Sequence, residues 1–209
     1  MDSFSLLIGG KAGDGIDMAG LTIARILNQL GYRLYIYRDY PSIIRGGHTF
    51  SIIRASKDKI ATHLNKVDFL LALNQDSVDF HKDKLKDNTF IIYNSDIVKL
   101  EGLPAGTRSL GLPLGNIIKE ENALPVMYNS CVIGGFSKAI GLEWDILEKV
   151  FKKNIRKEID LNLKVALRGY NEAKEFVRIQ TLPNNSLPVL TGNEAIGLGL
   201  IKAGLKAYI

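Results

Sequence analysis

Glycines are concentrated near the start of the chain, in a segment whose composition suits the binding of an anion. Four of the seven residues from 9 to 15 are glycine. A glycine-rich turn that leads into a helix exposes backbone N–H groups at the positive end of the helix dipole, and both favour a phosphate or a carboxylate. Glycine suits such a turn because it has no side chain to block a ligand and adopts positive φ at little cost. Residues 9–15 are therefore the first candidate for binding chemistry.

The spacing of these glycines differs from the known phosphate-binding fingerprints. Gly10, Gly13 and Gly15 reverse the dinucleotide pattern G-x-G-x-x-G, and no G-K-[ST] follows to form a nucleoside-triphosphate loop. Asp14 also places a negative charge where a phosphate would bind. Three interpretations therefore stay open: a tight strand-to-helix turn without a ligand, an anion site, and a dinucleotide site.

A second glycine-bearing segment, residues 40–48, follows the second expected strand. In an open parallel sheet the loops that leave the carboxyl ends of strands share one edge, where ligands bind. We therefore expect this segment beside the first, with Arg45 able to grip a carboxylate or phosphate through two parallel hydrogen bonds. Alternatively, Arg45 is a surface residue that pairs with Asp39 or Asp14. The candidate anion-binding or interface positions come from both loops: Gly10, Lys11, Gly13, Asp14, Gly15, Ser42, Arg45, Gly46 and Gly47.

The remaining reactive side chains form no recognisable catalytic set. His48 has no nucleophile that can be paired with it, so we interpret it as a hydrogen-bonded structural residue rather than a general base. Cys131 lies in an apolar segment without flanking cations, which indicates inert packing. The histidines and the single cysteine do not match the ligand spacing of zinc or of an iron–sulfur cluster. We predict no catalytic residue and no metal site.

The composition is typical of a folded globular protein in the cytoplasm. The chain has 209 residues, of which 46% are hydrophobic and 23% charged. No apolar stretch approaches the roughly 18 to 20 residues that span a bilayer, no secretory signal is recognisable, and a lone cysteine fits a reducing compartment. The formal net charge is +5, but residues 143–160 mix both signs as a solvated helix does, and no aromatic and basic ladder predicts nucleic-acid binding.

Hydrophobic patterning predicts alternating strands and helices. Short apolar runs bounded by turn residues indicate strands at 4–8, 34–37, 50–55, 69–73 and 90–93. Apolar residues at helical spacing indicate helices at 16–30, 126–140, 144–151 and 155–177, with a short helix or turn at 76–85. Residues 101–125 are rich in proline and glycine and predict a long irregular connection. Together these elements predict an α/β fold of three layers, α/β/α, with a mostly parallel central sheet.

Two ordered motifs give the chain a family resemblance. Residues 8–16, followed by Ala19 and Gly20 in the expected helix, precede residues 41–47, which lie before a strand. In this order and separation the motifs resemble the gamma domain of the 2-oxoacid:ferredoxin oxidoreductases. The resemblance extends over residues 1–178, and it is strongest in the first 55.

The C-terminal part extends this resemblance. Residues 179–191 carry two prolines without periodicity and are predicted to form a linker. Residues 192–199 are similar to the start of the alpha, thiamine-diphosphate-type domain in members whose gamma and alpha domains are fused. We therefore expect residues 192–209 to be the start of such a domain, truncated, in an alpha subunit of the 2-oxoglutarate type.

The resemblance implies a part in the oxidative decarboxylation of a 2-oxoacid with coenzyme A, which gives an acyl-CoA and electrons for ferredoxin. Thiamine diphosphate, the iron–sulfur cluster and coenzyme A would belong to the whole complex, with no cofactor bound by these residues alone. The implied partners are the remainder of the alpha subunit and a beta subunit, and the fragment alone is expected to be inactive. The alternatives are a free-standing nucleotide- or dinucleotide-binding α/β protein and a pure interaction module.

Overall fold

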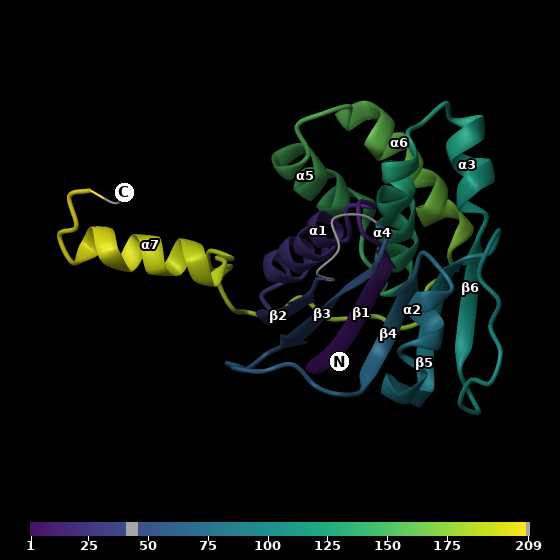
Figure 1. Cartoon of the computed structure of the whole chain (residues 1–209), viewed down its shortest axis with the longest axis horizontal. Coiled ribbons are helices and arrows are strands. Elements are labelled where there is room, and N and C mark those ends of the chain that lie inside the picture. Colours follow the sequence, from purple (N-terminus) through teal and green to yellow (C-terminus); the bar gives the residue numbers. More distant parts are fainter. Residues whose placement is uncertain (41–45, 208–209) are drawn as a thin grey trace.

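A six-stranded sheet forms the centre of the molecule in the computed structural model, which describes residues 1–40 and 46–207 (Figure 1). The strand order is β2-β3-β1-β4-β5-β6. Among the described strands, β3 alone runs in the direction opposite to the other five, so the sheet is mixed and mostly parallel, as predicted. The strands are β1 (Ser3–Lys11), β2 (Arg33–Asp39), β3 (His48–Ser56), β4 (Val67–Ala72), β5 (Leu85–Asn94) and β6 (Arg108–Leu112).

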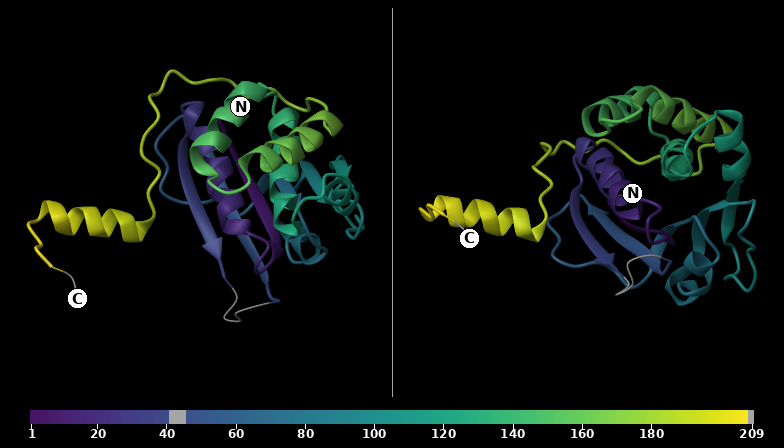
Figure 2. Two further views of the ribbon diagram at one scale, coloured as in Figure 1. Left: turned by 90° about the horizontal axis from the view of Figure 1, so that it is seen from above. Right: turned by 45° about the horizontal axis from the view of Figure 1, so that its top comes forward.

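Helices cover the two faces of the sheet unequally (Figure 2). One face carries α1 (Ile16–Gln29), α3 (Leu114–Glu120), α4 (Tyr128–Ala139), α5 (Trp144–Asn154) and α6 (Ile159–Glu172), which enclose the larger apolar core. The other face carries the short helix α2 (Asp76–Asp79) and a 3₁₀ turn (Lys82–Lys84) over a smaller core. The predicted three layers are present, and the second helical layer is thin.

The first strand and helix follow directly from the local sequence. The apolar centre of β1 is buried on both faces because the strand lies inside the sheet. Ile16, Ile23 and Leu27 lie on one side of α1 and are buried against the sheet. Glycines in the left-handed region flank the helix, Gly15 at φ +75° and Gly31 at φ +87°, and they fix its ends close to the predicted ones.

Helices α4 and α6 cross at unusually short distance through two glycines. A Cβ atom at Gly134 would overlap the carbonyl oxygen of Ala166, and one at Gly169 would overlap that of Cys131. Any larger residue at either position would push the helices apart. Cys131 is fully buried in this crossing, and burial raises the pKa of its thiol to about 12, as expected of an inert packing residue.

Two regions differ from the expected elements. Residues 101–125 are not one irregular connection, because they contain β6 and α3. The expected helix at 155–177 covers only Ile159–Glu172, and Glu158 precedes it in the left-handed region at φ +48°. The chain then runs extended over the body of the molecule, by which we mean the sheet and helices α1–α6. There the N–H of Phe176 donates to the carbonyl of Ala139 at 2.8 Å.

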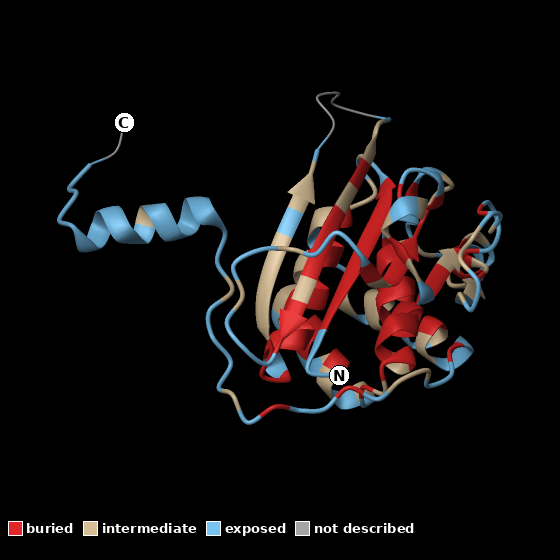
Figure 3. Ribbon diagram, turned by 90° about the horizontal axis from the view of Figure 1, so that it is seen from below, coloured by how far each residue is buried: buried red, intermediate tan, exposed pale blue. Residues whose placement is uncertain are grey.

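The predicted linker is partly docked on the body. The N–H of Leu182 donates to the carbonyl of Leu30 at 2.8 Å, and both Ile179 and Leu182 are buried. Farther along, Leu187 forms two hydrogen bonds with the side chain of Asn28. Beyond the docked part, the chain runs away from the sheet to helix α7 (Gly192–Lys202) (Figure 3).

Helix α7 (Gly192–Lys202) projects from the body and contains no buried residue (Figures 1 and 3). It begins with a capping box in which Thr191 and Glu194 satisfy each other's backbone N–H groups. Its sequence is nevertheless rich in apolar residues, including Ile196 and Ile201, which are 63% and 69% exposed. No helix in the described part of the chain is both long and apolar enough to cross a membrane.

Candidate functional site

The two glycine segments meet at one edge of the sheet. The first follows β1 and leads into α1, with Gly13 and Gly15 at φ +102° and +75°. The N–H of Ala12 donates to the carbonyl of Gly47 at 2.7 Å, so residues 46–47 lie beside the first loop. Ser42 and Arg45, the other two predicted positions of the second segment, lie outside the described residues.

The glycines of the first loop serve different purposes. A Cβ at Gly9 would lie 2.7 Å from the Oγ of Ser77, and one at Gly10 would lie 2.6 Å from the Cδ1 of Ile16. At these two positions a Cβ atom would force a neighbouring side chain to shift, so packing inside the protein favours glycine. Around Gly13, in contrast, no atom of the described residues lies within 4 Å of an added Cβ, so only its positive φ requires glycine.

The loop also contains its own carboxylate. The N–H of Lys11 donates to Oδ2 of Asp14 at 3.1 Å, and the N–H of Asp14 donates to the carbonyl of Lys11 at 2.9 Å. Asp14 therefore takes a backbone donor that an anionic ligand would use, and Asp17 adds a second negative charge in the first turn of α1. The loop is held closed by its own side chain, and an incoming anion would have to displace that carboxylate.

Asn129, at the start of α4, fixes the same loop and is not among the predicted residues. Its Nδ2 donates to the carbonyls of Asp14 and Val126. The side chain is 8% exposed, and its Oδ1 has no hydrogen-bond partner among the described residues. An asparagine within an otherwise apolar helical run was the available signal, but the sequence does not show what such a residue contacts.

A pair of histidines, one of which is the last residue of the second segment, lies on the thinly covered face of the sheet. Nε2 of His48 and Nε2 of His81 are 2.9 Å apart, so His48 is hydrogen-bonded as predicted. The Nδ1 atoms of both rings are buried without a partner in the described part of the chain. Burial lowers the pKa of His81 to about 4 and also lowers the pKa of His48. The pair is therefore neutral at pH 7, and only one of the two rings donates the shared proton.

The third histidine extends this pair into an aromatic strip. His63 stacks on Tyr37 with ring centroids 4.8 Å apart, and Tyr37 contacts Phe50, which in turn contacts both rings of the pair. The histidines are scattered in sequence but lie on one sheet face. Even so, no group of three potential metal-ligating side chains occurs in residues 1–40 and 46–207.

The sheet and the paired loops define the class of the protein: an α/β domain whose two glycine segments meet at one sheet edge. The chain belongs to the pyruvate ferredoxin/flavodoxin oxidoreductase family, whose model matches residues 5–172. The family expected from the motifs is confirmed.

Curated relatives match the chain in two different ways. It is 27% identical over 175 residues to the 2-oxoglutarate synthase subunit KorC of Archaeoglobus fulgidus, covering 83% of this chain and 90% of that one. It is 24% identical over 258 residues to the alpha subunit of 2-oxoacid:ferredoxin oxidoreductase 2 of Aeropyrum pernix, covering 98% of this chain and 40% of that one. The chain thus spans most of one kind of relative and less than half of the other.

Solved structures share the fold. The 2-oxoglutarate:ferredoxin oxidoreductase from Magnetococcus marinus aligns with a TM-score of 0.85 at 24% identity, over 98% of this chain and 38% of that chain. The gamma subunit of a keto/oxoacid ferredoxin oxidoreductase from Geobacter sulfurreducens aligns with a TM-score of 0.68 at 20% identity, over 81% and 98%. The second structure matches the body, whereas the first also matches the segment that holds α7.

Proposed function

We propose that this chain is the gamma domain of a 2-oxoacid:ferredoxin oxidoreductase of the 2-oxoglutarate type, working inside a larger complex. The observation that carries the proposal is the family match over residues 5–172. The substrate assignment rests on two similar proteins, a 2-oxoglutarate synthase subunit and a 2-oxoglutarate:ferredoxin oxidoreductase. In such a complex the domain contributes to the coenzyme A-dependent oxidative decarboxylation of 2-oxoglutarate to succinyl-CoA, with ferredoxin as electron acceptor.

Within the complex, the two glycine segments are proposed to contact either the bound ligand or another domain. The closed state of the first loop supports contact with a domain, because Asp14 already occupies the donor of Lys11. The candidate positions remain Gly10, Lys11, Gly13, Asp14, Gly15, Ser42, Arg45, Gly46 and Gly47.

We also propose a domain organisation, which the comparisons with longer relatives support. We assign residues 1–178 to the gamma domain, 179–191 to a linker and 192–209 to the start of an alpha, thiamine-diphosphate-type domain. Helix α7 supports this assignment, because a helix that is apolar on all sides is normally buried in a protein core. Alignment of 98% of this chain with the longer alpha subunit of Aeropyrum pernix also supports it.

The cofactors are assigned to the rest of the complex. The sequence holds a single cysteine, and the described residues offer no group of three ligands, so these residues do not fit an iron–sulfur cluster. We propose that thiamine diphosphate, the cluster and coenzyme A bind to the remainder of the alpha subunit and to a beta subunit. The complex is proposed to be cytoplasmic.

A reconstitution experiment tests the proposal. Oxidation of 2-oxoglutarate is assayed in two preparations: the 209 residues alone, and the complete alpha subunit with its beta partner. Each preparation is assayed with and without ferredoxin. We expect turnover by the complete complex and none by the 209 residues. Turnover by the 209 residues alone, or a complex that is inactive with every 2-oxoacid, would contradict the proposal.

A thermal-shift measurement distinguishes the proposed function from the alternative of a free-standing nucleotide-binding protein. A ligand at about 100 times its dissociation constant stabilises a protein by about 2.7 kcal/mol. We expect no shift with micromolar NAD or ATP. A clear shift would favour the free-standing dinucleotide- or nucleotide-binding protein instead.

A further inference from the structure

A groove of about 760 Å³ runs along the outer edge of β2. Successive residues from Tyr32 to Ile36 line it. Because successive side chains of a strand point to opposite faces of the sheet, a lining of consecutive residues places the groove at the strand's edge. β2 is the terminal strand in the sheet order, and no other described strand pairs with this edge.

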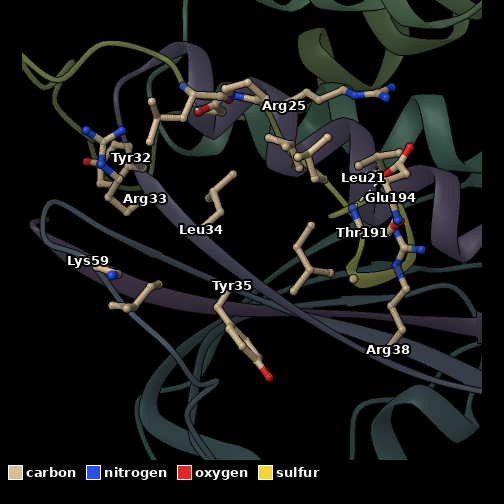
Figure 4. A pocket seen from close by; sticks show the side chains of 18 of the residues that line it. Leu21, Arg25, Tyr32, Arg33, Leu34, Tyr35, Arg38, Lys59, Thr191 and Glu194 are labelled. Atoms are coloured by element: carbon tan, nitrogen blue, oxygen red, sulfur yellow. Dashed lines mark hydrogen bonds between the residues drawn. The ribbon is translucent and has the colours of Figure 1, made fainter. Parts of the chain in front are cut away.

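Segments from both sides of the sheet wall the groove (Figure 4). On the helical side the wall is residues 187–192, held by Asn28, whose Nδ2 donates to the carbonyl of Leu187 at 2.8 Å. On the other side the wall includes Lys59 and Ile60, in the loop whose His63 stacks on Tyr35 and Tyr37. The result is an open slot along a strand edge, with Leu34 and Ile36 on its floor.

The slot is positively charged. Arg25, Arg33, Arg38 and Lys59 line it, and none of them forms an ion pair within residues 1–40 and 46–207. Its one lining carboxylate, Glu194, already accepts hydrogen bonds from the backbone N–H and hydroxyl of Thr191. Positive charge is therefore left over along the edge of β2.

On β2 itself, Arg33 and Arg38 lie toward the two ends of the strand, and the residues between them carry no charge. Arg33 and Arg38 are five residues apart on one strand, which corresponds to about 17 Å. By the alternation of the strand, Arg38 shares the helical face of β2 with the apolar Leu34 and Ile36, with Val189 in the facing wall, whereas Arg33 and Tyr35 lie on the other face. A single small anion would leave one end of this arrangement unused, whereas an extended peptide about as long as β2 reaches both.

We infer that the edge of β2 receives an extended, acidic segment of a partner subunit, which joins the sheet as a seventh strand. Backbone hydrogen bonds to the free edge supply affinity. Apolar side chains of the segment pack on Leu34 and Ile36, and its carboxylates meet Arg33 and Arg38 at the ends. This inference rests on the proposed function, because it takes the occupant to be another subunit of the complex.

Charge argues against the other occupants. A second copy of this chain would bring the same arginines and lysine to the slot, and like charges at an interface repel. The chain's own residues 187–192 already form one wall and then lead away into α7. Charged residues also protect exposed strand edges from aggregation, but protection requires neither an apolar floor nor two walls.

Hydrogen exchange in the native complex tests the inference. Amide exchange is followed by mass spectrometry in the complete alpha subunit alone and in the same subunit assembled with its beta partner. We expect exchange of residues 33–39 to slow by at least about tenfold on assembly. The fully internal strand β1 serves as the control, because its amides are already paired on both sides.

A charge-reversal variant completes the test. Arg33→Glu with Arg38→Glu is expected to weaken assembly by about tenfold and to remove the added protection of β2. The matched control reverses Arg156 and Lys157, two exposed cations outside the slot, and should leave assembly unchanged. Circular dichroism melting establishes that both double variants are folded.

The outcomes separate this inference from the proposed function. A complex that assembles and turns over while residues 33–39 exchange as fast as in the alpha subunit alone overturns the inference and leaves the proposed function intact. Failure of the native subunits to assemble overturns both. Protection that arises in the alpha subunit alone, with a dimer seen by sedimentation, overturns the assignment to a partner subunit.

Discussion

The crossing of α4 and α6 and the projecting helix α7 use the same small residue in opposite circumstances. In the crossing, Gly134 and Gly169 each lie against a carbonyl of the other helix with no room for a Cβ atom. In α7, Gly197 and Gly199 have no atom of the described residues within 4 Å of an added Cβ. Helices α4 and α7 are both apolar, yet α4 is buried almost throughout and α7 contains no buried residue.

This difference shows that burial depends on the neighbours a helix meets as well as on its own composition. The sequence of α7 provides an apolar surface and a capping box, which suffice for a helix. What it lacks within the described residues is a complementary surface of the kind that α6 provides for α4. Substitutions in the two regions test this contrast between the packed α4 and the exposed α7.

Substitution of Gly134 by alanine should destabilise the body of the molecule. The added methyl group would overlap the carbonyl of Ala166, so α4 and α6 must separate. We expect the free energy of unfolding, measured by urea denaturation, to fall by about 3 kcal/mol. Gly199→Ala is the matched control and should leave that free energy unchanged. Equal losses in the two variants would show that α7 is packed as tightly as α4.

A pH titration examines the buried histidine pair of the body. Burial places the pKa of His81 at about 4, below the ordinary value of 6.5. The neutral pair therefore contributes stability that is complete above pH 6.5 and is lost as the pH falls toward 4, by at most about 3 kcal/mol. His81→Gln keeps a polar group beside His48 but cannot titrate, so its unfolding free energy should vary less over this range.

The control for the titration is the third histidine. His63→Gln removes an imidazole that stacks on Tyr37 outside the pair. It should retain the acid sensitivity of the unmodified protein. Acid sensitivity that disappears with His63 rather than with His81 would refute the role of the buried pair.

Two asparagines extend the comparison to single hydrogen bonds. Asn129 anchors the first glycine loop from the start of α4, whereas Asn193 is exposed in α7. Asn129→Ala should cost about 1 to 2 kcal/mol in the free energy of unfolding, because the carbonyl of Asp14 loses its donor. Asn193→Ala should cost nothing measurable in the same urea titration. A neutral Asn129→Ala variant would mean that the loop is held by other contacts.

The smallest global effect is expected from the cap of α7. Thr191→Ala removes the hydroxyl that accepts from the N–H of Glu194, which costs the helix about 1 kcal/mol locally. Amide exchange in residues 192–202 should accelerate about fivefold, while the urea midpoint of the body stays unchanged. A shifted midpoint would show that α7 is energetically coupled to the body, and would contradict the contrast between the packed α4–α6 crossing and the unpacked α7.

Much of the fold was predictable because its signals are local. The apolar runs of β1, β4 and β5 and the one-sided pattern of α1 identify buried elements without reference to the rest of the chain. Strand β6 was missed because its five residues include a glycine and lie between prolines, which are the marks of a loop. Its burial depends on pairing with β5, a contact that no local pattern encodes.

The site was predictable only in part, for the same reason. The glycine loop and the proximity of residues 46–47 follow from the topology of parallel sheets. The pairing of His48 with His81 joins residues 33 positions apart and left no local trace. Likewise, the net charge of +5 did not reveal that four cations, none in an ion pair among the described residues, line one strand edge.

The buried thiol of Cys131 is a built-in probe of how often the packed helices open. Because its sulfur is out of reach of water and its ionisation is suppressed, an alkylating reagent can modify it only after the two helices above the sheet come apart. The rate of modification therefore reports how often the body opens, without any engineered label. Docking of a partner at a distant face would appear as a slower reaction at this one atom.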